Sequence, residues 1–167
     1  MALRQIRLQG DEILKRKSKP VKEITQAVLE LLDDLKQTMD AKDGVGIAAP
    51  QVGILRRIAL VAHEEDFYEL INPEIVELEG DQRCNEACLS VAGLCGDVER
   101  PFKITVKYTN RKGEELTVTV EDFLASVFCH EIDHLDGILF IDKATNVKPL
   151  DEEQRRMRRR YRRKVRR

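Results

Sequence analysis

The sequence predicts an α+β fold, in which mixed or antiparallel strands pack around a central helix that carries an HExxH metal-binding pattern. The predicted elements run in the order helix, strands, helix, without the strand–helix alternation of a doubly wound sheet. With 167 residues, of which 42% are hydrophobic and 35% charged, the chain is long enough for one core and too short for two comfortable domains. We therefore expect one domain over residues 1–150 and a basic C-terminal helix or tail over residues 151–167.

The first third of the chain predicts an arm, a helix and an irregular segment. Residues 1–20 are typical of an extended arm. Between residues 25 and 40 the apolar side chains recur with helical spacing, which predicts an amphipathic helix. These side chains are Val28, Leu31, Leu32, Leu35 and Met39. The following stretch, residues 44–53, is rich in small residues and broken by proline, so we expect no regular element there.

The middle of the chain predicts strands and then the second helix. Runs of apolar and β-branched residues predict strands at 57–61, 69–78, 104–108 and 116–120. Asn72, which precedes a proline, should bend the second strand, and the turn signal at 110–113 joins the last two as a hairpin. Asp122 is the expected N-cap of a helix over residues 123–135, which Gly137 should end.

The second helix carries the pattern that indicates chemistry. His130 and His134 are four residues apart, so both imidazoles lie on one helix face and can reach one metal ion. Glu131 lies beside the first of them, where a carboxylate can take a proton from metal-bound water. The apolar flanks predict a buried helix, in which these polar groups cost free energy unless they are paired or bind metal. Metal-assisted hydrolysis is therefore the leading hypothesis.

Two histidines do not complete a catalytic metal site, which usually has three protein ligands and one open position. A metzincin would place a further histidine where this chain has Phe140. The helix alone leaves three candidates for the third ligand: His63, a downstream carboxylate or a cysteine.

Apolar content and cysteine usage indicate the cellular compartment. No apolar run approaches the length of a membrane span, and the N-terminus lacks the apolar stretch of a signal peptide, so we expect a cytoplasmic protein. The four cysteines are Cys84, Cys88, Cys95 and Cys129. In a cytosolic chain, free thiols are the default over disulfides, and Cys129 fits a buried thiol in an apolar helix.

The basic charges are concentrated at the C-terminus. Residues 151–167 hold ten of the 29 Lys and Arg and three of the 30 Asp and Glu, so the tail carries +7 and the other 150 residues −8. Met157, Tyr161 and Val165 recur every four residues, which gives a narrow apolar stripe on a basic helix. Such a segment attracts phosphate backbones without sequence preference. The alternative is a disordered, solubilising tail.

Three segments together resemble the three signature motifs of peptide deformylases. They are GVGIAAPQ at 44–51, EACLS at 86–90 and HEIDHLDG at 130–137, and they occur in the family's order and spacing. The resemblance runs from about Leu8 to Asp142. It implies a catalytic domain over 1–150 that removes the formyl group from the formyl-methionine of newly made polypeptides.

The resemblance also implies roles for individual residues. The implied metal ligands are Cys88, His130 and His134. Such a site is expected to hold Fe²⁺, with Zn²⁺, Ni²⁺ or Co²⁺ as substitutes. Glu131 would act as general base toward water and as general acid toward the departing amine. The side-chain amide of Gln51 and the backbone N–H of Leu89 would stabilise the oxyanion.

The expected substrate contacts come from the same motifs. Gly46 would let the peptide backbone approach and pair like a strand. Ile47 or Phe128 could line an apolar pocket for the methionine side chain. Ala87 stands where the family has glycine, so a required positive φ would strain it, or its methyl could crowd the substrate. Ala92 replaces a family proline, which predicts a less rigid loop.

Further expectations complete the sequence prediction. Glu86 and Arg100 are expected to form a partly buried ion pair that holds the metal loop. The basic tail, residues 155–167, is expected to contact the ribosome or its RNA, as in some deformylases. Two alternatives remain open: a general HExxH zinc peptidase, and a catalytically weak or dead paralogue that binds metal or the ribosome.

Overall fold

The computed structural model describes residues 2–156, which form a mixed α+β fold with antiparallel sheets and few helices, as predicted. The larger sheet has the order β1-β2-β3-β6-β7: β1 (Gly46–Ala48), β2 (Ile58–His63), β3 (Asp66–Glu79), β6 (Lys103–Thr109) and β7 (Glu115–Glu121). The smaller sheet has the order β4-β5-β8: β4 (Gln82–Cys88), β5 (Val91–Arg100) and β8 (Thr145–Pro149). The helical segments are α1 (Gln26–Ala41), α2 (Asp122–Leu135) and the short 3₁₀ helices η1 (Glu12–Lys15), η2 (Ala49–Val52) and η3 (Phe140–Asp142).

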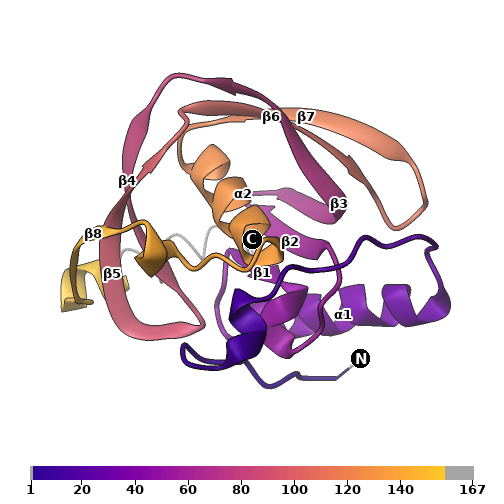
Figure 1. Ribbon diagram of the computed structural model, residues 1–167, viewed down its shortest axis with the longest axis horizontal. Helices are drawn as coiled ribbons and strands as arrows, with labels where there is room; N and C mark the ends of the chain where they lie inside the picture. The colour runs from indigo at the N-terminus through magenta and orange to yellow at the C-terminus, as the bar shows by residue number, and fades with distance from the viewer. Residues whose placement is uncertain (1, 157–167) are drawn as a thin grey trace.

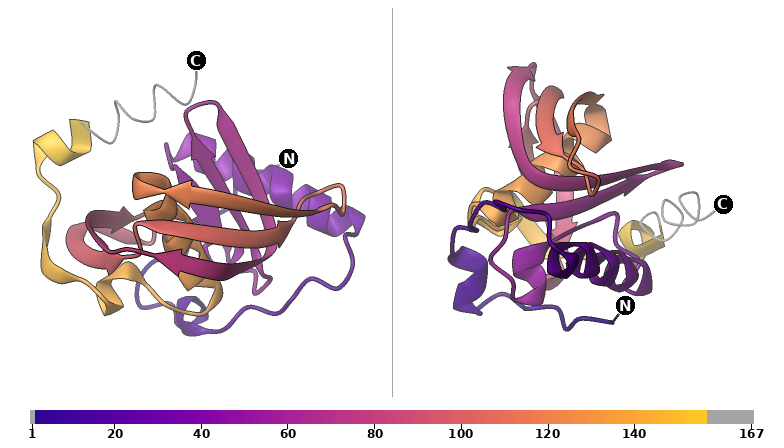
Figure 2. Two further views of the ribbon diagram at one scale, coloured as in Figure 1. Left: turned by 90° about the horizontal axis from the view of Figure 1, so that it is seen from above. Right: turned by 90° about the vertical axis from the view of Figure 1, so that its right-hand side faces the viewer.

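Helix α2 lies in the interior, where the two sheets face it (Figure 1). Strands β4, β5 and β8 lie on one side of it, and β3, β6 and β7 pass over another. Both views in Figure 2 show β3 as the long curved strand that links the β1–β2 side of the molecule to the β6–β7 side. The site-bearing helix is thus enclosed by elements that are distant in sequence.

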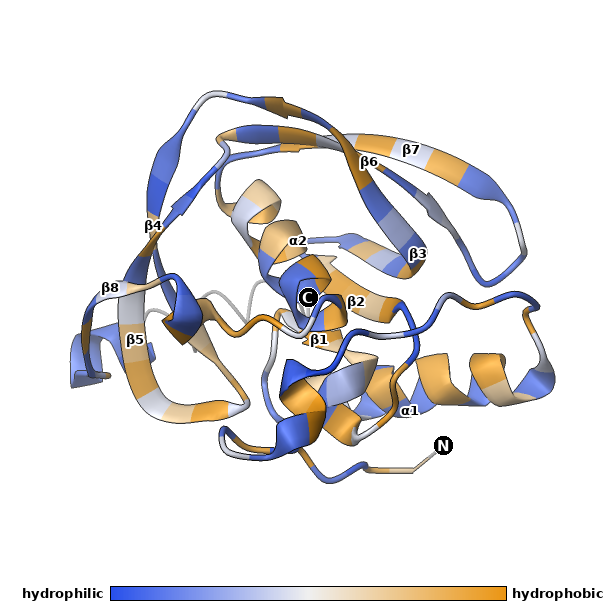
Figure 3. Ribbon diagram, in the orientation of Figure 1, coloured by the Kyte–Doolittle hydropathy of each residue, from blue (hydrophilic) through white to orange (hydrophobic). Residues whose placement is uncertain are grey.

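Strands β1 and β2 separate two apolar clusters, because successive side chains in a strand point to opposite faces. Ala59 and Val61 pack with the apolar residues of α2, whereas Ile58 and Leu60 pack with those of α1. The hydrophobic colouring of β2 in Figure 3 reflects this burial on both faces. The core therefore fixes the position of α2 against β1 and β2.

Several predicted elements are confirmed. Helix α1 differs by one residue at each end from the predicted range, and the hairpin of β6 and β7 pairs Thr109 with Glu115. Strand β3 has a register shift after Ile71, where Asn72 adopts φ 51°, so the bend falls where it was predicted. Gly137 ends α2 with φ 76°, and a Cβ there would collide with the backbone of Lys15.

Other predictions were wrong. Residues 44–53 were expected to be irregular, but they contain β1 and η2, because the small side chains let this segment pack tightly in the core. Strands β4, β5 and β8 were not predicted; β4 is largely polar and lacks the alternation that signals a strand. Asp122 is the first residue of α2, with φ 54°, and Glu121 occupies the N-cap position without a side-chain cap.

The C-terminal part is described only as far as residue 156. Residues 152–156 are helical, and most of the predicted basic tail, 157–167, lies outside the described residues. Within the part that the structure describes, no helix has both the length and the apolar composition needed to cross a membrane.

Candidate metal centre and active site

Three potential metal ligands meet between α2 and the end of β4. His130 and His134 project from α2, and Cys88 is the last residue of β4. One ligand atom from each of the three lies within 4.8 Å of the other two. Cys88 Sγ lies 3.3 Å from His134 Nε2, close to the separation of about 3.6 Å expected for sulfur and nitrogen on one tetrahedral zinc ion. Among the described residues, the geometry therefore fits a three-ligand metal site.

The electrostatics of these three groups also fit a cation. Burial alone would raise the pKa of the Cys88 thiol, but the charges and hydrogen bonds of His134 and His130 hold it well below its usual range. Burial alone would lower the pKa of His130, but hydrogen bonds to Cys88 and Glu86 raise it well above the usual value. A thiolate beside two imidazoles is a donor set that a divalent transition metal binds with loss of the ligand protons.

A buried ion pair orients the first histidine. Arg100 donates to both carboxylate oxygens of Glu86, from Nε at 2.7 Å and from Nη2 at 3.0 Å, so the predicted pair is confirmed. Burial would raise the pKa of Glu86, but His130 and Arg100 lower it to about 2. Because Glu86 is ionised, it can only accept, and His130 Nδ1 donates to it across 2.8 Å. The imidazole is thereby held with Nε2 available to a metal.

Glu131 lies on α2 between the two histidines and is 4% exposed. Burial raises the pKa of its carboxyl to about 7, although the charges of His130 and His134 act in the opposite direction. Its Oε2 is buried and has no hydrogen-bond partner among the described residues. A carboxyl with a pKa near neutrality, poised beside a metal site, is suited to both accept and return a proton.

Gln51 is held in one orientation by the backbone of its own segment. Its Oε1 accepts a hydrogen bond from the Ala48 N–H at 2.9 Å, which turns Nε2 toward the ligands. Nε2 donates to Ser90 Oγ at 3.1 Å and approaches Cys88 Sγ at 3.5 Å. The amide is 1% exposed, so these contacts keep a donor in place beside the sulfur.

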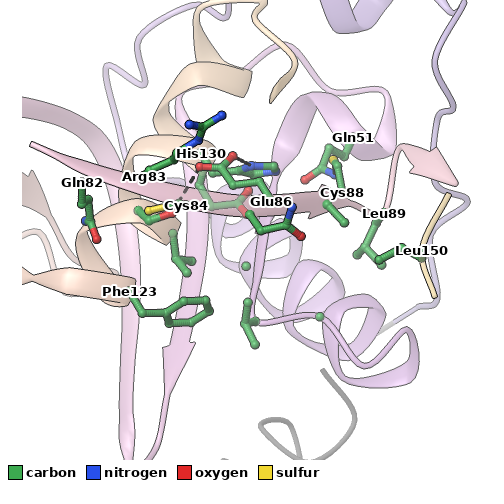
Figure 4. Close-up of a pocket in the computed structure, with 18 of the residues that line it drawn as sticks. Gln51, Gln82, Arg83, Cys84, Glu86, Cys88, Leu89, Phe123, His130 and Leu150 are labelled. Atoms are coloured by element: carbon green, nitrogen blue, oxygen red, sulfur yellow. Dashed lines mark hydrogen bonds and ion pairs between the residues drawn. The ribbon is translucent and has the colours of Figure 1, made fainter. Parts of the chain in front are cut away.

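One cavity of about 520 Å³ is lined by Gln51, Glu86, Cys88, His130 and Glu131 (Figure 4). Figure 4 shows Cys84, Gln82 and Phe123 toward one end of the cavity, and Gln51, Leu89 and Leu150 toward the other. Glu86 and His130 lie between the two ends, and Cys88 lies beside Gln51. The cavity therefore extends from Cys84 and Phe123 past His130 to Gln51 and Leu89.

Comparisons with known proteins decide the family. The family model for polypeptide deformylase matches residues 3–150. A peptide deformylase from Thermoanaerobacter pseudethanolicus is 52% identical over 155 residues, which are 93% of this chain and 96% of that protein. The chain belongs to the peptide deformylase family. Peptide deformylases are metal-dependent enzymes that remove the formyl group from N-terminal methionine.

Solved peptide deformylase structures share the fold. The crystal structure from Thermotoga maritima superposes with a TM-score of 0.84 at 37% identity, covering 87% of this chain and 99% of that chain. A class I type b peptide deformylase from Acinetobacter baumannii, in a structure with Met-Ala-Ser bound, gives a TM-score of 0.82 at 34% identity and covers 85% of this chain and 98% of that chain.

The residues predicted to contact substrate in this deformylase are not all at the cavity. Gly46 and Ala87 line it. Ile47 faces the α1 side of β1, opposite to Gly46, and belongs to the cluster around α1. Phe128 lies on the part of α2 that packs against Tyr68, at a ring distance of 5.1 Å. Both side chains are 0% exposed, and neither is among the residues that line the cavity.

Other side chains take their places in the deformylase cavity. They are Cys84, Phe123, Ser126 and Val127. The last three recur at helical spacing on the face of α2 that carries His130, a signal that was available from the sequence. Cys84 and Glu86 are two residues apart in β4, a signal that was hidden because β4 was not predicted. His63, a candidate third ligand, instead lies 6.1 Å from the Phe123 ring.

The structure separates the two explanations offered for Ala87. The described non-glycine residues with positive φ do not include Ala87, so backbone strain at this position is ruled out. The residue is half-buried and lines the cavity, so the expected crowding by its methyl remains a prediction. Ala92, which was expected to lie in a loop, belongs to β5 and also lines the cavity. All four cysteines are free thiols.

Proposed function

We propose that this cavity is where the chain hydrolyses the formyl group of N-terminal formyl-methionine, releasing formate and a free amine. The observation that carries the proposal is the meeting of three ligand atoms beside the buried Glu131 in one open cavity. We propose that Cys88, His130 and His134 hold the metal. Fe²⁺ is our proposed ion, and Zn²⁺, Ni²⁺ or Co²⁺ suit the same sulfur and nitrogen donors.

The bound ion would supply a Lewis acid that polarises the formyl oxygen and makes water more acidic. Glu131 takes a proton from the water that attacks the formyl carbon. The same carboxyl then gives that proton to the methionine nitrogen as the C–N bond breaks. Its pKa of about 7 supports both steps, because neither protonation state is strongly favoured near neutral pH.

Negative charge develops on the formyl oxygen during the attack, and donors fixed in advance stabilise it. We propose that Gln51 Nε2 and the Leu89 backbone N–H are these donors. Gln51 Nε2 lies 3.5 Å from Cys88 Sγ, and sulfur is a weaker acceptor than the Oε1 that receives the Ala48 N–H at 2.9 Å. The weaker contact can therefore be exchanged for the oxyanion while the stronger one keeps the amide oriented.

The substrate peptide would bind as an additional strand. Strand β1 is at the edge of the larger sheet and pairs with β2 on one side only. Its residue Gly46 lines the cavity, so an extended peptide can pair there. The methionine side chain would enter the end formed by Cys84, Phe123 and Val127. The Acinetobacter enzyme with Met-Ala-Ser bound supports a peptide substrate that begins with methionine.

We propose the cytoplasm as the compartment, since nascent chains are made there. For residues 155–167 we propose contact with the ribosome or ribosomal RNA, supported by the charge of +7 on residues 151–167. Deleting residues 151–167 should abolish salt-dependent cosedimentation with ribosomes. Unchanged cosedimentation would refute this part of the proposal.

The two alternatives make different predictions. A general HExxH zinc peptidase would cleave internal peptide bonds and give no role to Gln51 or Cys88, although both lie at the cavity. A dead paralogue would release no formate despite its intact Glu131. The family match and the converging site favour the deformylase over both.

The decisive experiment uses anaerobically purified, Fe²⁺-loaded protein and formyl-Met-Ala-Ser, with formate release as the readout. Glu131→Ala should lower kcat at least about 100-fold while bound metal is unchanged. Glu115→Ala, an exposed glutamate on β7, is the matched control and should retain full activity. Full activity in Glu131→Ala, or cleavage of internal bonds instead of formate release, would refute the proposal.

A further inference from the structure

The α-carbon of Gly46 faces the side chain of Glu131. A β-carbon built on Gly46 would collide with Glu131 Oε1 and would lie 2.8 Å from both Cδ and Cγ of the same side chain. Real β-carbons almost never approach another heavy atom within 3.0 Å, so any side chain here forces a displacement. The contact involves three atoms of one residue, and that residue is the candidate general base.

The backbones of both partners are fixed by packing, whereas the Glu131 side chain lines the cavity and can move. Gly46 is buried in β1, where it pairs with Val61 of β2. Glu131 projects from the middle of α2, whose neighbouring residues Phe128 and Leu135 are 0% exposed. Shifting β1 or α2 would therefore disturb a close-packed core, and the carboxylate is the group that would be displaced.

Packing against Gly46 limits where the Glu131 carboxylate can lie. Its Oε2 is buried without a hydrogen-bond partner within the described part of the chain. The surface that limits its position on the β1 side is the bare α-carbon of Gly46. The absent side chain thus defines the space that the carboxylate fills.

We infer that Gly46 is a positioning residue for Glu131: its missing side chain leaves the space in which the carboxylate lies. The inference rests on the proposed role of Glu131 as base. It differs from the backbone pairing expected at Gly46, because strand hydrogen bonds run in the plane of the sheet whereas side chains stand perpendicular to it. One glycine can therefore serve the peptide at its edge and the carboxylate on its face.

Gly46→Ala should lower kcat for formyl-Met-Ala-Ser about 100-fold, since a displacement of about 1 Å in a catalytic group has an effect of that size. KM should change by less than about threefold, because the pairing edge of β1 is unchanged. The bound metal, measured by elemental analysis, should also be unchanged. Full kcat in a metal-containing Gly46→Ala variant would overturn the inference.

A double-mutant cycle in stability tests the contact without relying on activity. The urea midpoint should fall on Gly46→Ala when residue 131 is glutamate, and the fall should largely disappear in a Glu131→Ala background. Gly44→Ala is the matched control: its β-carbon would lie 3.2 Å from the Gly46 backbone oxygen, 3.2 Å from Met39 Cγ and 3.3 Å from Leu89 Cδ1. None of these three nearest atoms belongs to Glu131. The control should therefore lower the midpoint equally in both backgrounds.

The outcomes separate the inference from the proposed function. Equal losses for Gly46→Ala in both backgrounds would overturn the inference even if the unmodified chain were active. If the unmodified chain released no formate, the proposed function would fail, and coupling in the cycle would still support the contact. If Gly46→Ala does not fold, recovery of folded protein in the Glu131→Ala background supports the inference, and failure of both variants to fold overturns it.

Discussion

Replacing Glu86 by alanine removes a carboxylate that Arg100, His130 and Ser126 share. Both partners of the ion pair are buried, with side chains 3% exposed for Arg100 and 6% for Glu86. Arg100 would keep its bond of 2.6 Å from Nη1 to Asp133, but Nε and Nη2 would lose their acceptor. His130 Nδ1 and Ser126 Oγ would each lose an acceptor as well.

Breaking a buried pair on one side costs about 3–5 kcal/mol, because the remaining charge is left without compensation. The surviving bond to Asp133 places Glu86→Ala at the lower end, at about 3 kcal/mol. For a chain of this length, that loss corresponds to a Tm lowered by about 6–12 °C. Metal affinity should fall about 10-fold or more, since the carboxylate orients a ligand imidazole.

The assay is equilibrium unfolding of the metal-free protein in urea at neutral pH, so that metal affinity does not contribute. Arg83→Ala is the control: its side chain is 55% exposed and lies 3.3 Å from Asp97, so the loss should stay below about 0.5 kcal/mol. A loss below about 1 kcal/mol for Glu86→Ala would refute the reasoning, because the pair would then behave like an exposed one.

Three further predictions concern other parts of the molecule. Ala87→Gly removes a methyl from the cavity wall without relieving backbone strain, so kcat/KM for formyl-Met-Ala-Ser should rise about threefold or more; unchanged kinetics would rule out crowding. Removing the metal with a chelator should lower Tm by about 5–10 °C, because metal at 100 times its Kd stabilises the folded protein by about 2.7 kcal/mol. A Tm that does not change on adding the chelator would contradict the metal site. Burial would raise the pKa of Asp34, but hydrogen bonds from the Ala2 N–H and Arg4 lower it. The unmodified chain should therefore be more stable than Asp34→Asn by about 2 kcal/mol above about pH 5. This difference in unfolding free energy should shrink as the pH falls below 3.8, the usual pKa of an aspartate, and acid titrations followed by circular dichroism measure it. A difference that stays constant down to pH 2 would disprove this linkage.

The local elements were predictable where one pattern dominates. The apolar spacing of α1 and the turn before β7 are strong signals, and Asn72 marks the bend in β3. Strand β4 was missed because its sequence, QRCNEAC, has few apolar residues. Its one buried polar side chain, Glu86, is paired by Arg100 of β5 and by His130 of α2, and the second contact spans 44 residues of the chain.

The candidate site was likewise predictable from the sequence only in part. The histidine spacing on α2 follows from helix geometry, so the sequence predicted that both imidazoles could reach one ion. Whether Cys88 or His63 joined them could not be decided from spacing, because the answer depends on how β2 and β4 are placed around α2. The structure brings Cys88 to 3.3 Å from His134 and leaves His63 beside Phe123. Ile47 was misplaced because its strand was not predicted, and alternation in β1 turns it toward α1.

By itself, the sequence determined the α+β class, the HExxH helix and the three motifs that resemble peptide deformylases. These are properties of local spacing and residue type, which the backbone geometry of one segment fixes. Only the tertiary structure decided that Ala87 is unstrained, that Phe123 lines the cavity and that Gly46 faces Glu131. Each of these depends on the packing of segments distant in the chain, and packing is decided by the shapes of both surfaces at once.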